Sequence, residues 1–424
     1  MTTRRTLLGG GLALGAGLAL PATLAMPRLA RGASPRVVVV GGGFGGGTAA
    51  KYVKQLLPAA EVTLVERDRQ FVTCPFSNLV IGGLVKMEQI THGYDKIAKR
   101  GVKVVHDEAV GVDPAARKVT LKGGAVLDYD RLVLSPGIDL NYEGLPGYSE
   151  AAAEIMPHAW KAGPQTLLLK KQLEAMPDGG TVIIVAPANP FRCPPGPYER
   201  AGMIAWYLKK NKPKSKILIF DPKEKFSKQA LFFESYETLY PGMIQWIGGK
   251  QGGKVERVDP KTMTVEAGFG EEKGDVVNVI PPQRAGRIAQ VAGVTDEKGW
   301  CPIKPESMES TKVPGIHVVG DACIAGAMPK SGTAANSQAR NAAAAIVAAL
   351  EGKPVPEPSF ANTCYSVVAD GYGFSVTGLY GATPEGIKEI AGGVSKLKAP
   401  AKDRDLEAAY ALDWYRGIVH DALG

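Results

Sequence analysis

The chain has 424 residues, of which 45% are hydrophobic and 22% are charged. This length and composition are typical of a globular protein with two or three domains. Four arginines and no acidic residue lie in residues 1–33, so the rest of the chain carries only +4 of the net charge of +8. That excess is too small to indicate a nucleic-acid-binding protein.

The five cysteines exclude two further classes of site. None stands in the C-x-x-C-H motif that attaches a c-type haem, and no cluster of cysteine and histidine has the spacing of a metal site. In an exported chain of this length they do not form a disulfide scaffold, although one pair could persist as a disulfide. We therefore expect no metal site and no haem on this chain.

Residues 1–33 have the features of a Tat-type export signal. The twin arginine Arg4–Arg5 precedes a Gly-, Ala- and Leu-rich run that ends in small residues. A membrane anchor over 7–26 is the alternative, but the many glycines make a poor membrane helix. The sequence thus predicts a periplasmic protein whose mature chain has no integral membrane segment.

A dinucleotide-binding unit is predicted from residue 34 onward. The strand-like run RVVVV is followed by G-x-G-x-x-G at Gly41, Gly43 and Gly46, and then by a helix. Such glycines allow a tight turn and a close approach of the backbone to a pyrophosphate at the helix N-terminus. Glu66 ends the next strand, where its carboxylate could bind a ribose hydroxyl. The neighbouring Arg67 is a weaker candidate for a cofactor contact, and a solvated surface charge is the alternative. The remaining cofactor contacts predicted in this part of the chain are Phe44, Ala109, Ser135, Pro136 and Gly137.

A second unit of the same kind begins at residue 181, but its phosphate loop is missing. The strand TVIIV and the helix YERAGMIAWYLKK are present, and between them stand prolines and Cys193. Prolines lack the N–H groups that a pyrophosphate needs. Residues 151–280 are therefore predicted to be a degenerate NAD-like domain.

The late segment GIHVVGDACIAGAMPKSGTAAN favours FAD over NAD in the first unit. Asp321 is expected at a strand end, where it could accept a hydrogen bond from a ribityl hydroxyl. A helix that begins near Gly332 would face the electron-rich end of a flavin. Lys330 could stabilise a reduced flavin or lie at the surface, and both interpretations stay open.

Several segments without a generic role in the fold resemble the flavoprotein subunit of flavocytochrome c sulfide dehydrogenase. They are FVTCPFSNLVIGG, FRCPPGPYER, IPPQRAGRIAQ, GWCP, PKSG, NTCYS and WYRGIVHDALG. The resemblance implies an α/β flavoprotein of the disulfide-reductase type with two dinucleotide-binding domains. Its expected parts are the export signal (1–33), an FAD domain in two pieces (34–150 and 281–350), the degenerate NAD-like domain (151–280) and a C-terminal interface domain (351–424).

The resemblance also implies roles for three cysteines. Cys74 falls where the family carries a cysteine that is thioether-linked to the 8α-methyl group of FAD; a buried thiol beside a non-covalent flavin is the alternative. Cys193 and Cys364 match the family's redox-active disulfide, against the alternative of two unrelated structural thiols. Cys301 and Cys323 are read as packing thiols.

By the same resemblance, the chain would oxidise sulfide and pass the electrons through FAD to a c-type cytochrome subunit that carries the haem. Hydrosulfide would attack the disulfide and leave a persulfide on Cys193. Glu199 is either an acid–base group for this step or a favourable charge at a helix N-terminus. Three other functions are kept as alternatives: a sulfide:quinone oxidoreductase, a type-II NADH dehydrogenase, and a non-catalytic sulfur-carrier or electron-transfer subunit.

Overall fold

The computed structural model describes residues 34–424. The predicted export signal lies in residues 1–33, outside the described residues, so it stays a prediction. Among residues 34–424, no helix has a stretch that is long and apolar enough to cross a membrane.

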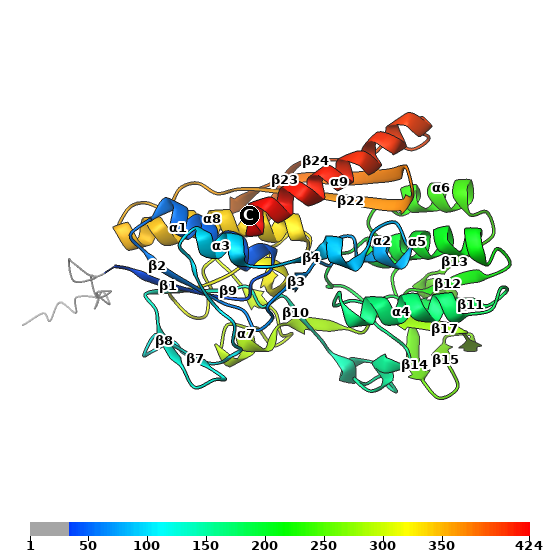
Figure 1. The fold of residues 1–424 in the computed structure, drawn as a ribbon, viewed down its shortest axis with the longest axis horizontal. Helices are drawn as coiled ribbons and strands as arrows, with labels where there is room; N and C mark the ends of the chain where they lie inside the picture. Colours follow the sequence, from blue (N-terminus) through cyan, green and yellow to red (C-terminus); the bar gives the residue numbers. More distant parts are fainter. Residues whose placement is uncertain (1–33) are drawn as a thin grey trace, which may run out of the picture. The chain divides into compact units, whose positions relative to one another are not determined.

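Five parallel strands form the first sheet (Figure 1). In hydrogen-bonded order they are β20 (Ile316–Val318), β9 (Arg131–Leu134), β1 (Arg36–Val40), β2 (Glu61–Val65) and β5 (Lys103–Val105). The central strand β1 is buried from Val37 to Val40, as expected for a parallel strand that is covered on both faces. Helix α1 (Phe44–Leu56) follows β1, and helix α8 (Gly332–Glu351) packs against α1.

Shorter elements surround this sheet. An antiparallel meander is formed by β6 (Ala109–Asp113), β7 (Lys118–Leu121) and β8 (Val126–Asp128). Four others come between β2 and β5 in the sequence. They are β3 (Phe71–Val72), α2 (Ser77–Ile81), β4 (Thr91–His92) and α3 (Asp95–Lys99).

A second parallel sheet follows in the middle of the chain. Its order is β13 (Ile244–Ile247), β12 (Lys216–Phe220), β11 (Thr181–Val185) and β17 (Val276–Val279). Its helices are α4 (Pro164–Ala175), α5 (Gly196–Asn211) and α6 (Gln229–Leu239). A meander completes it, with β14 (Val255–Asp259), β15 (Thr264–Ala267) and β16 (Gly270–Lys273).

The chain passes between the two sheets through a pair of antiparallel strands. These are β10 (Ile138–Leu140), which follows the first sheet, and β18 (Gln283–Ala285), which follows the second. Two short elements come next, α7 (Arg287–Val291) and β19 (Cys301–Pro302); β21 (Cys323–Ile324), the partner of β19, follows β20. Strand β20 completes the first sheet, so this sheet is built from two separate stretches of the chain.

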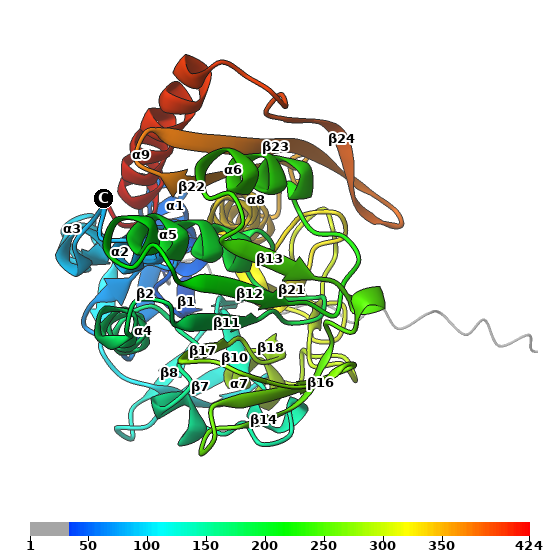
Figure 2. The same ribbon diagram turned by 90° about the vertical axis from the view of Figure 1, so that its right-hand side faces the viewer.

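The C-terminal segment packs on helices of two units, the first sheet with its helices (the first unit) and the second sheet with its helices (the second unit). It consists of β22 (Ser359–Ala369), β23 (Tyr372–Thr383), β24 (Gly386–Val394) and α9 (Ala401–Leu423). Strand β22 packs against α8 and α5, while α9 lies against β23 and α1; Figure 2 shows the three strands and α9 together along one side. The predicted fold class, an α/β protein with two nucleotide-binding-type sheets and a C-terminal segment, is confirmed.

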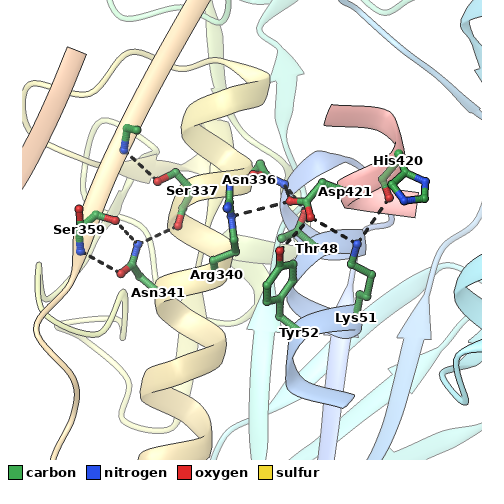
Figure 3. A network of polar contacts seen from close by, with 11 residues as sticks. Thr48, Lys51, Tyr52, Asn336, Ser337, Arg340, Asn341, Ser359, His420 and Asp421 are labelled. Carbon is green, nitrogen blue, oxygen red and sulfur yellow. Dashed lines mark hydrogen bonds and ion pairs between the residues drawn. The ribbon is translucent and has the colours of Figure 1, made fainter. Parts of the chain in front are cut away.

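A partly buried polar network fixes the end of α9 to α1 and α8 (Figure 3). The Asp421 carboxylate accepts hydrogen bonds from the Tyr52 hydroxyl at 2.8 Å, the Asn336 amide at 2.7 Å and the Lys51 ammonium at 3.4 Å. The start of β22 is held in a similar way, because Ser359 and the Asn341 side chain exchange two hydrogen bonds. Both ends of the C-terminal segment are thus tied to helices of the first unit.

Candidate active site

A cavity of about 1520 Å³ lies at the carboxyl ends of β1, β2 and β9. Loops from the second sheet and residues of β22 also line it. It brings together fifteen of the residues predicted for the site: Gly41, Gly43, Phe44, Glu66, Arg67, Cys74, Ala109, Ser135, Pro136, Gly137, Cys193, Glu199, Asp321, Gly332 and Cys364. Gly46 and Lys330, the other two predicted residues, are not among the lining residues.

The three motif glycines have different structural roles in the turn between β1 and α1. Gly41 has a φ of +97°, and a Cβ on it would lie 2.3 Å from the Ser135 carbonyl oxygen. A Cβ on Gly46 would lie 1.7 Å from the Gly41 carbonyl oxygen, so Gly46 serves the packing of α1 on the turn. A Cβ on Gly43 would meet only the Phe71 ring, at 3.6 Å, which leaves the N-terminus of α1 open to the cavity.

Glu66 holds the glycine turn from the end of β2. Its carboxylate accepts hydrogen bonds from the Gly42 amide at 2.7 Å and from the Asp68 amide at 3.0 Å. The Arg67 side chain next to it is 59% exposed and forms an ion pair with Asp68. Glu66 therefore faces the cavity at the place expected for a ribose-binding carboxylate, and Arg67 lies at its exposed edge.

The opposite part of the cavity contains a buried acceptor that is free to bind a ligand. Within residues 34–424, Asp321 Oδ1 is buried and accepts no hydrogen bond. Burial raises the pKa of this carboxyl group, and the nearby charges of Arg192 and Lys330 oppose the shift. A hydroxyl donor of a ligand would satisfy this oxygen. With two helix N-termini, at Gly43 and Gly332, open to the same cavity, the residues fit a flavin dinucleotide.

Lys330 is partly buried and does not lie at the surface, while a role towards a reduced flavin stays a prediction. Its ammonium donates to the carbonyl oxygens of Asp321 at 2.7 Å and Cys323 at 2.8 Å, and it lies 3.9 Å from the centre of the Trp300 ring. The side chain is half-buried and supports the turn that presents Asp321.

The loop before α5 has no open cradle for a phosphate. The amide of Arg192 donates to the Gln283 side chain at 2.9 Å, and the amide of Cys193 donates to the Lys330 carbonyl at 2.8 Å. Pro194 and Pro195 have no N–H to offer. The amides that a nucleotide phosphate would use in a complete NAD-binding domain are therefore occupied or missing.

Cys74, Cys193 and Cys364 line the same cavity, and all three are free thiols in the structure. The expected disulfide therefore stays a prediction. Cys193 is held in the left-handed backbone region, with a φ of +59°. A hydrogen bond from the Cys193 thiol lowers the pKa of Cys74 to about 6, and the charges of Arg192 and Arg200 act in the same direction. The same bond, together with burial, raises the pKa of Cys193.

Glu199 lies in the first turn of α5 and faces these thiols. Its carboxylate accepts hydrogen bonds from the Val367 amide at 3.1 Å and the Asn78 amide group at 3.2 Å. Burial raises the pKa of Glu199 to about 7. A carboxyl group with such a pKa can both accept and donate a proton at neutral pH, which is the property required of an acid–base group.

Arg200, Asn78 and Lys228 belong to the site but were not predicted. Arg200 is 1% exposed, and its guanidinium donates to neutral acceptors, namely Asn78 Oδ1, Asn278 Oδ1 and the carbonyls of His158 and Ala159. Asn78 also donates to the Gly196 carbonyl, so it joins the Cys74 segment to α5. Lys228, at the start of α6, donates to the Cys364 carbonyl. The sequence around each of these residues carries no signal that identifies it as a residue of the site.

Cys301 and Cys323 lie outside the cavity lining. They are partners in the short parallel pair β19–β21, and both are buried. Burial raises the pKa of each thiol to about 12, so they remain protonated at neutral pH. This environment matches the packing role expected for them.

Three family models match the chain. The model described as "Sulfide dehydrogenase [flavocytochrome c] flavoprotein chain, central" matches residues 166–281, and "Flavocytochrome c sulphide dehydrogenase, flavin-binding" matches residues 356–423. The model described as "Pyridine nucleotide-disulphide oxidoreductase" matches residues 35–170. The matches thus cover the second sheet, the first sheet apart from β20, and the C-terminal strands and helix.

Similar proteins point to the same group. Over 45 residues the chain is 67% identical to the flavoprotein chain of sulfide dehydrogenase (flavocytochrome c) from Chlorobaculum thiosulfatiphilum, covering 11% of this chain and 94% of that sequence. It is 23% identical to the mitochondrial sulfide:quinone oxidoreductase of Mus musculus, covering 70% of this chain and 67% of that protein. The solved sulfide:quinone oxidoreductase of Aquifex aeolicus shares the fold, with a TM-score of 0.72, 19% identity and 92% of each chain covered.

Proposed function

Because this chain belongs to the family of flavocytochrome c sulfide dehydrogenase flavoprotein chains, we propose that it oxidises sulfide with FAD and passes the electrons to a c-type cytochrome. The observation that carries this proposal is the shared cavity. Cys193, Cys364 and Glu199 line the same space as the open helix N-terminus at Gly43 and the buried acceptor of Asp321.

The reacting groups of the chain are a disulfide between Cys193 and Cys364 and the carboxyl group of Glu199. Hydrosulfide attacks the sulfur of Cys193, a new S–S bond forms, and the bond to Cys364 breaks. The products are a protonated persulfide on Cys193 and a thiolate on Cys364, so the single negative charge of hydrosulfide is conserved. The Glu199 carboxylate then takes up the persulfide proton, which leaves the carboxyl group neutral and the persulfide anionic. A second sulfide or thiol removes the sulfane sulfur. Bound FAD supplies two-electron oxidation and single-electron release.

The cofactor would be held by the residues around the glycine turn. Gly43 and Gly332 offer open helix N-termini, Glu66 suits a ribose, and Asp321 Oδ1 suits a ribityl hydroxyl. We propose in addition that Cys74 forms the thioether bond to the flavin. Its lowered pKa favours the thiolate, which is the nucleophilic form. Acid-precipitated protein should then keep its flavin, and release of all the flavin would contradict the bond.

Export to the periplasm is a further part of the proposal, and it depends on the twin arginine in residues 1–33. Replacing Arg4 and Arg5 by lysine is expected to leave the protein in the cytoplasm, which cell fractionation would measure. Unchanged periplasmic accumulation of this double variant would contradict the proposed route.

Quinone is the second candidate acceptor, because relatives named sulfide:quinone oxidoreductase match about two thirds of their length to this chain. The deciding experiment is an anaerobic titration of the purified flavoprotein with sulfide, followed by addition of either cytochrome c or a soluble quinone. We expect sulfide to bleach the flavin and cytochrome c to restore it. Reoxidation by quinone alone would reverse the choice of acceptor.

The same titration tests the chemistry itself. Cys193→Ser is expected to abolish bleaching by sulfide, while Cys301→Ser, which changes a buried thiol outside the cavity lining, should leave it unchanged. Full sulfide oxidation by Cys193→Ser would refute the disulfide mechanism. A wild-type flavin that sulfide does not reduce would favour a non-catalytic subunit, and bleaching by NADH would favour a dehydrogenase of that cofactor.

A further inference from the structure

A buried lysine contacts the strand residue that carries the Cys364 thiol. Lys228 is 9% exposed. Its ammonium donates to the carbonyl oxygen of Cys364 at 2.9 Å and to the Ser366 hydroxyl at 2.8 Å. An ammonium group has three donors, so these two bonds leave one N–H. Lys228 is thus fixed against β22, and one N–H group of its ammonium is not used in these two hydrogen bonds.

The charge of Lys228 is not neutralised by an ion pair. Within residues 34–424, no carboxylate lies within 4 Å of its ammonium. The titratable groups that act on it are Cys364 on β22, Glu199 on α5, Cys193 in the loop before α5, and Glu407 on α9. Burial raises the pKa of the Cys364 thiol, and the Lys228 charge opposes this shift. Lys228 is therefore the cation that favours an anionic sulfur at Cys364.

The surroundings of Cys193 differ in their contact with Lys228. The Lys228 ammonium is hydrogen-bonded to the backbone of Cys364, and its charge interacts more strongly with Cys364 than with Cys193. The charge of Glu199 acts on both sulfurs, so it does not distinguish them. Cys74 carries no charge once it is linked to the flavin. The two sulfurs of the proposed disulfide thus differ in how well each would carry a negative charge.

We propose that Lys228 is a positioning residue for Cys364: its buried ammonium stabilises the anionic sulfur at Cys364 and so directs hydrosulfide to Cys193. This inference rests on the proposed function. In thiol–disulfide exchange the sulfur whose thiolate is more stable leaves faster. The new bond joins the sulfur of hydrosulfide to Cys193, the bond between Cys193 and Cys364 breaks, and its electron pair stays on Cys364.

The test measures the reactivity of Cys364 directly. The flavin-loaded full chain is reduced anaerobically and alkylated with iodoacetamide at several pH values, and peptide mass spectrometry gives the rate at Cys364. Lys228→Gln keeps a hydrogen-bond donor but removes the charge. We expect it to slow alkylation of Cys364 near pH 8 by about tenfold, which corresponds to a rise of about one unit in the thiol pKa. Lys228→Arg should restore most of the rate.

Lys212 provides a matched control. It is also 9% exposed, and its ammonium donates only to the carbonyls of Leu173, Glu174 and Met176. Lys212→Gln should therefore leave the Cys364 rate unchanged. A Cys364 rate in Lys228→Gln equal to that of the wild type would overturn the inference, and so would an equal loss in Lys212→Gln.

A second measurement separates this inference from the function on which it rests. After one equivalent of sulfide, the persulfide is located by peptide mapping. The wild type should carry it on Cys193, and Lys228→Gln should carry a several-fold larger share on Cys364. An unchanged distribution would count against Lys228. A wild type that forms no persulfide at all would contradict the proposed sulfide chemistry, while the alkylation rates would still decide the role of Lys228.

Discussion

Glu199 shows how one residue is tuned by opposing interactions in the cavity. Burial disfavours its carboxylate, whereas the hydrogen bonds from Val367 and Asn78 and the charge of Lys228 favour it. The outcome is a pKa of about 7 instead of the ordinary 4.5. At neutral pH this residue therefore exists in both protonation states, and folding stability depends on which state is populated.

We predict that the wild type loses stability relative to Glu199→Gln as the pH rises from about 4.5 to 7. In this window the folded protein holds the Glu199 proton and the unfolded chain releases it, so a higher pH favours unfolding. The shift corresponds to a relative loss on the order of 3 kcal/mol. Urea unfolding of both proteins across this range measures it.

The difference between the two proteins should be constant above the folded pKa, because Glu199 is then ionised in both states. A difference that does not change with pH anywhere between 5 and 8 would show that the pKa of Glu199 is not raised. Comparing the variant with the wild type cancels the titration of other groups.

The residues of the site could be predicted only in part. Gly41 and Gly43 follow from a spacing that is local in the sequence, and Glu199 stands six positions after Cys193. Lys228 and Arg200 could not be found in this way. Lys228 contacts Cys364 across 136 positions, and Arg200 contacts Asn78 across 122. Nothing in the neighbouring sequence distinguishes such a buried cation from a solvated one.

At the scale of elements, different glycines in the turn between β1 and α1 serve helix packing and cofactor binding. Gly46 lies against the carbonyl of Gly41, whereas Gly43 lines the cavity and a Cβ on it would touch only the Phe71 ring. Alanine should therefore disturb the protein in different ways at these two positions, although they belong to one motif.

We predict that Gly46→Ala destabilises the protein by about 3 kcal/mol, since the added methyl group would force the helix and the turn apart. Gly43→Ala should change the stability by less than about 1 kcal/mol but weaken flavin binding, because its methyl group enters the cavity. Thermal unfolding and the flavin-to-protein ratio of each variant measure the two effects. Equal stability losses in the two variants would refute this division.

Most elements could be predicted because their patterns are local. The run RVVVV, the strands TVIIV and KILIF and the helix at 332–351 carry their own periodicity. The pairing of β10 with β18 and the placement of β20 beside β9 could not be derived in this way. These contacts join segments more than 100 residues apart, and they are decided by tertiary packing.

At the scale of the whole described chain, the C-terminal segment connects the two units. Strand β22 packs on α5 of the second unit and α8 of the first, and α9 ends against α1. The attachment of α9 depends on Asp421, which is the carboxylate partner of the buried Lys51. Losing that carboxylate would leave a buried cation unpaired.

We predict that Asp421→Ala lowers the free energy of unfolding by about 2 kcal/mol, less than for a fully buried pair because the Asp421 side chain is 28% exposed. Asp413→Ala on the same helix is the control. It breaks an ion pair with Arg416 in which both side chains are more than 70% exposed, and it should cost less than about 0.5 kcal/mol. Chemical denaturation of both variants gives the comparison, and similar losses would contradict a special role for Asp421.

The docking of Asp421 on α1 also bears on the order of events during protein synthesis. The glycine turn at 41–46 is among the first described parts of the chain to leave the ribosome, yet its helix gains the support of Asp421 only when the last residues follow. Strand β20 and helix α8, which complete the first sheet and the cavity, are also made late. A nascent chain therefore cannot assemble the finished cavity, and stable insertion of a nucleotide cofactor has to wait until α8 and α9 have both left the ribosome.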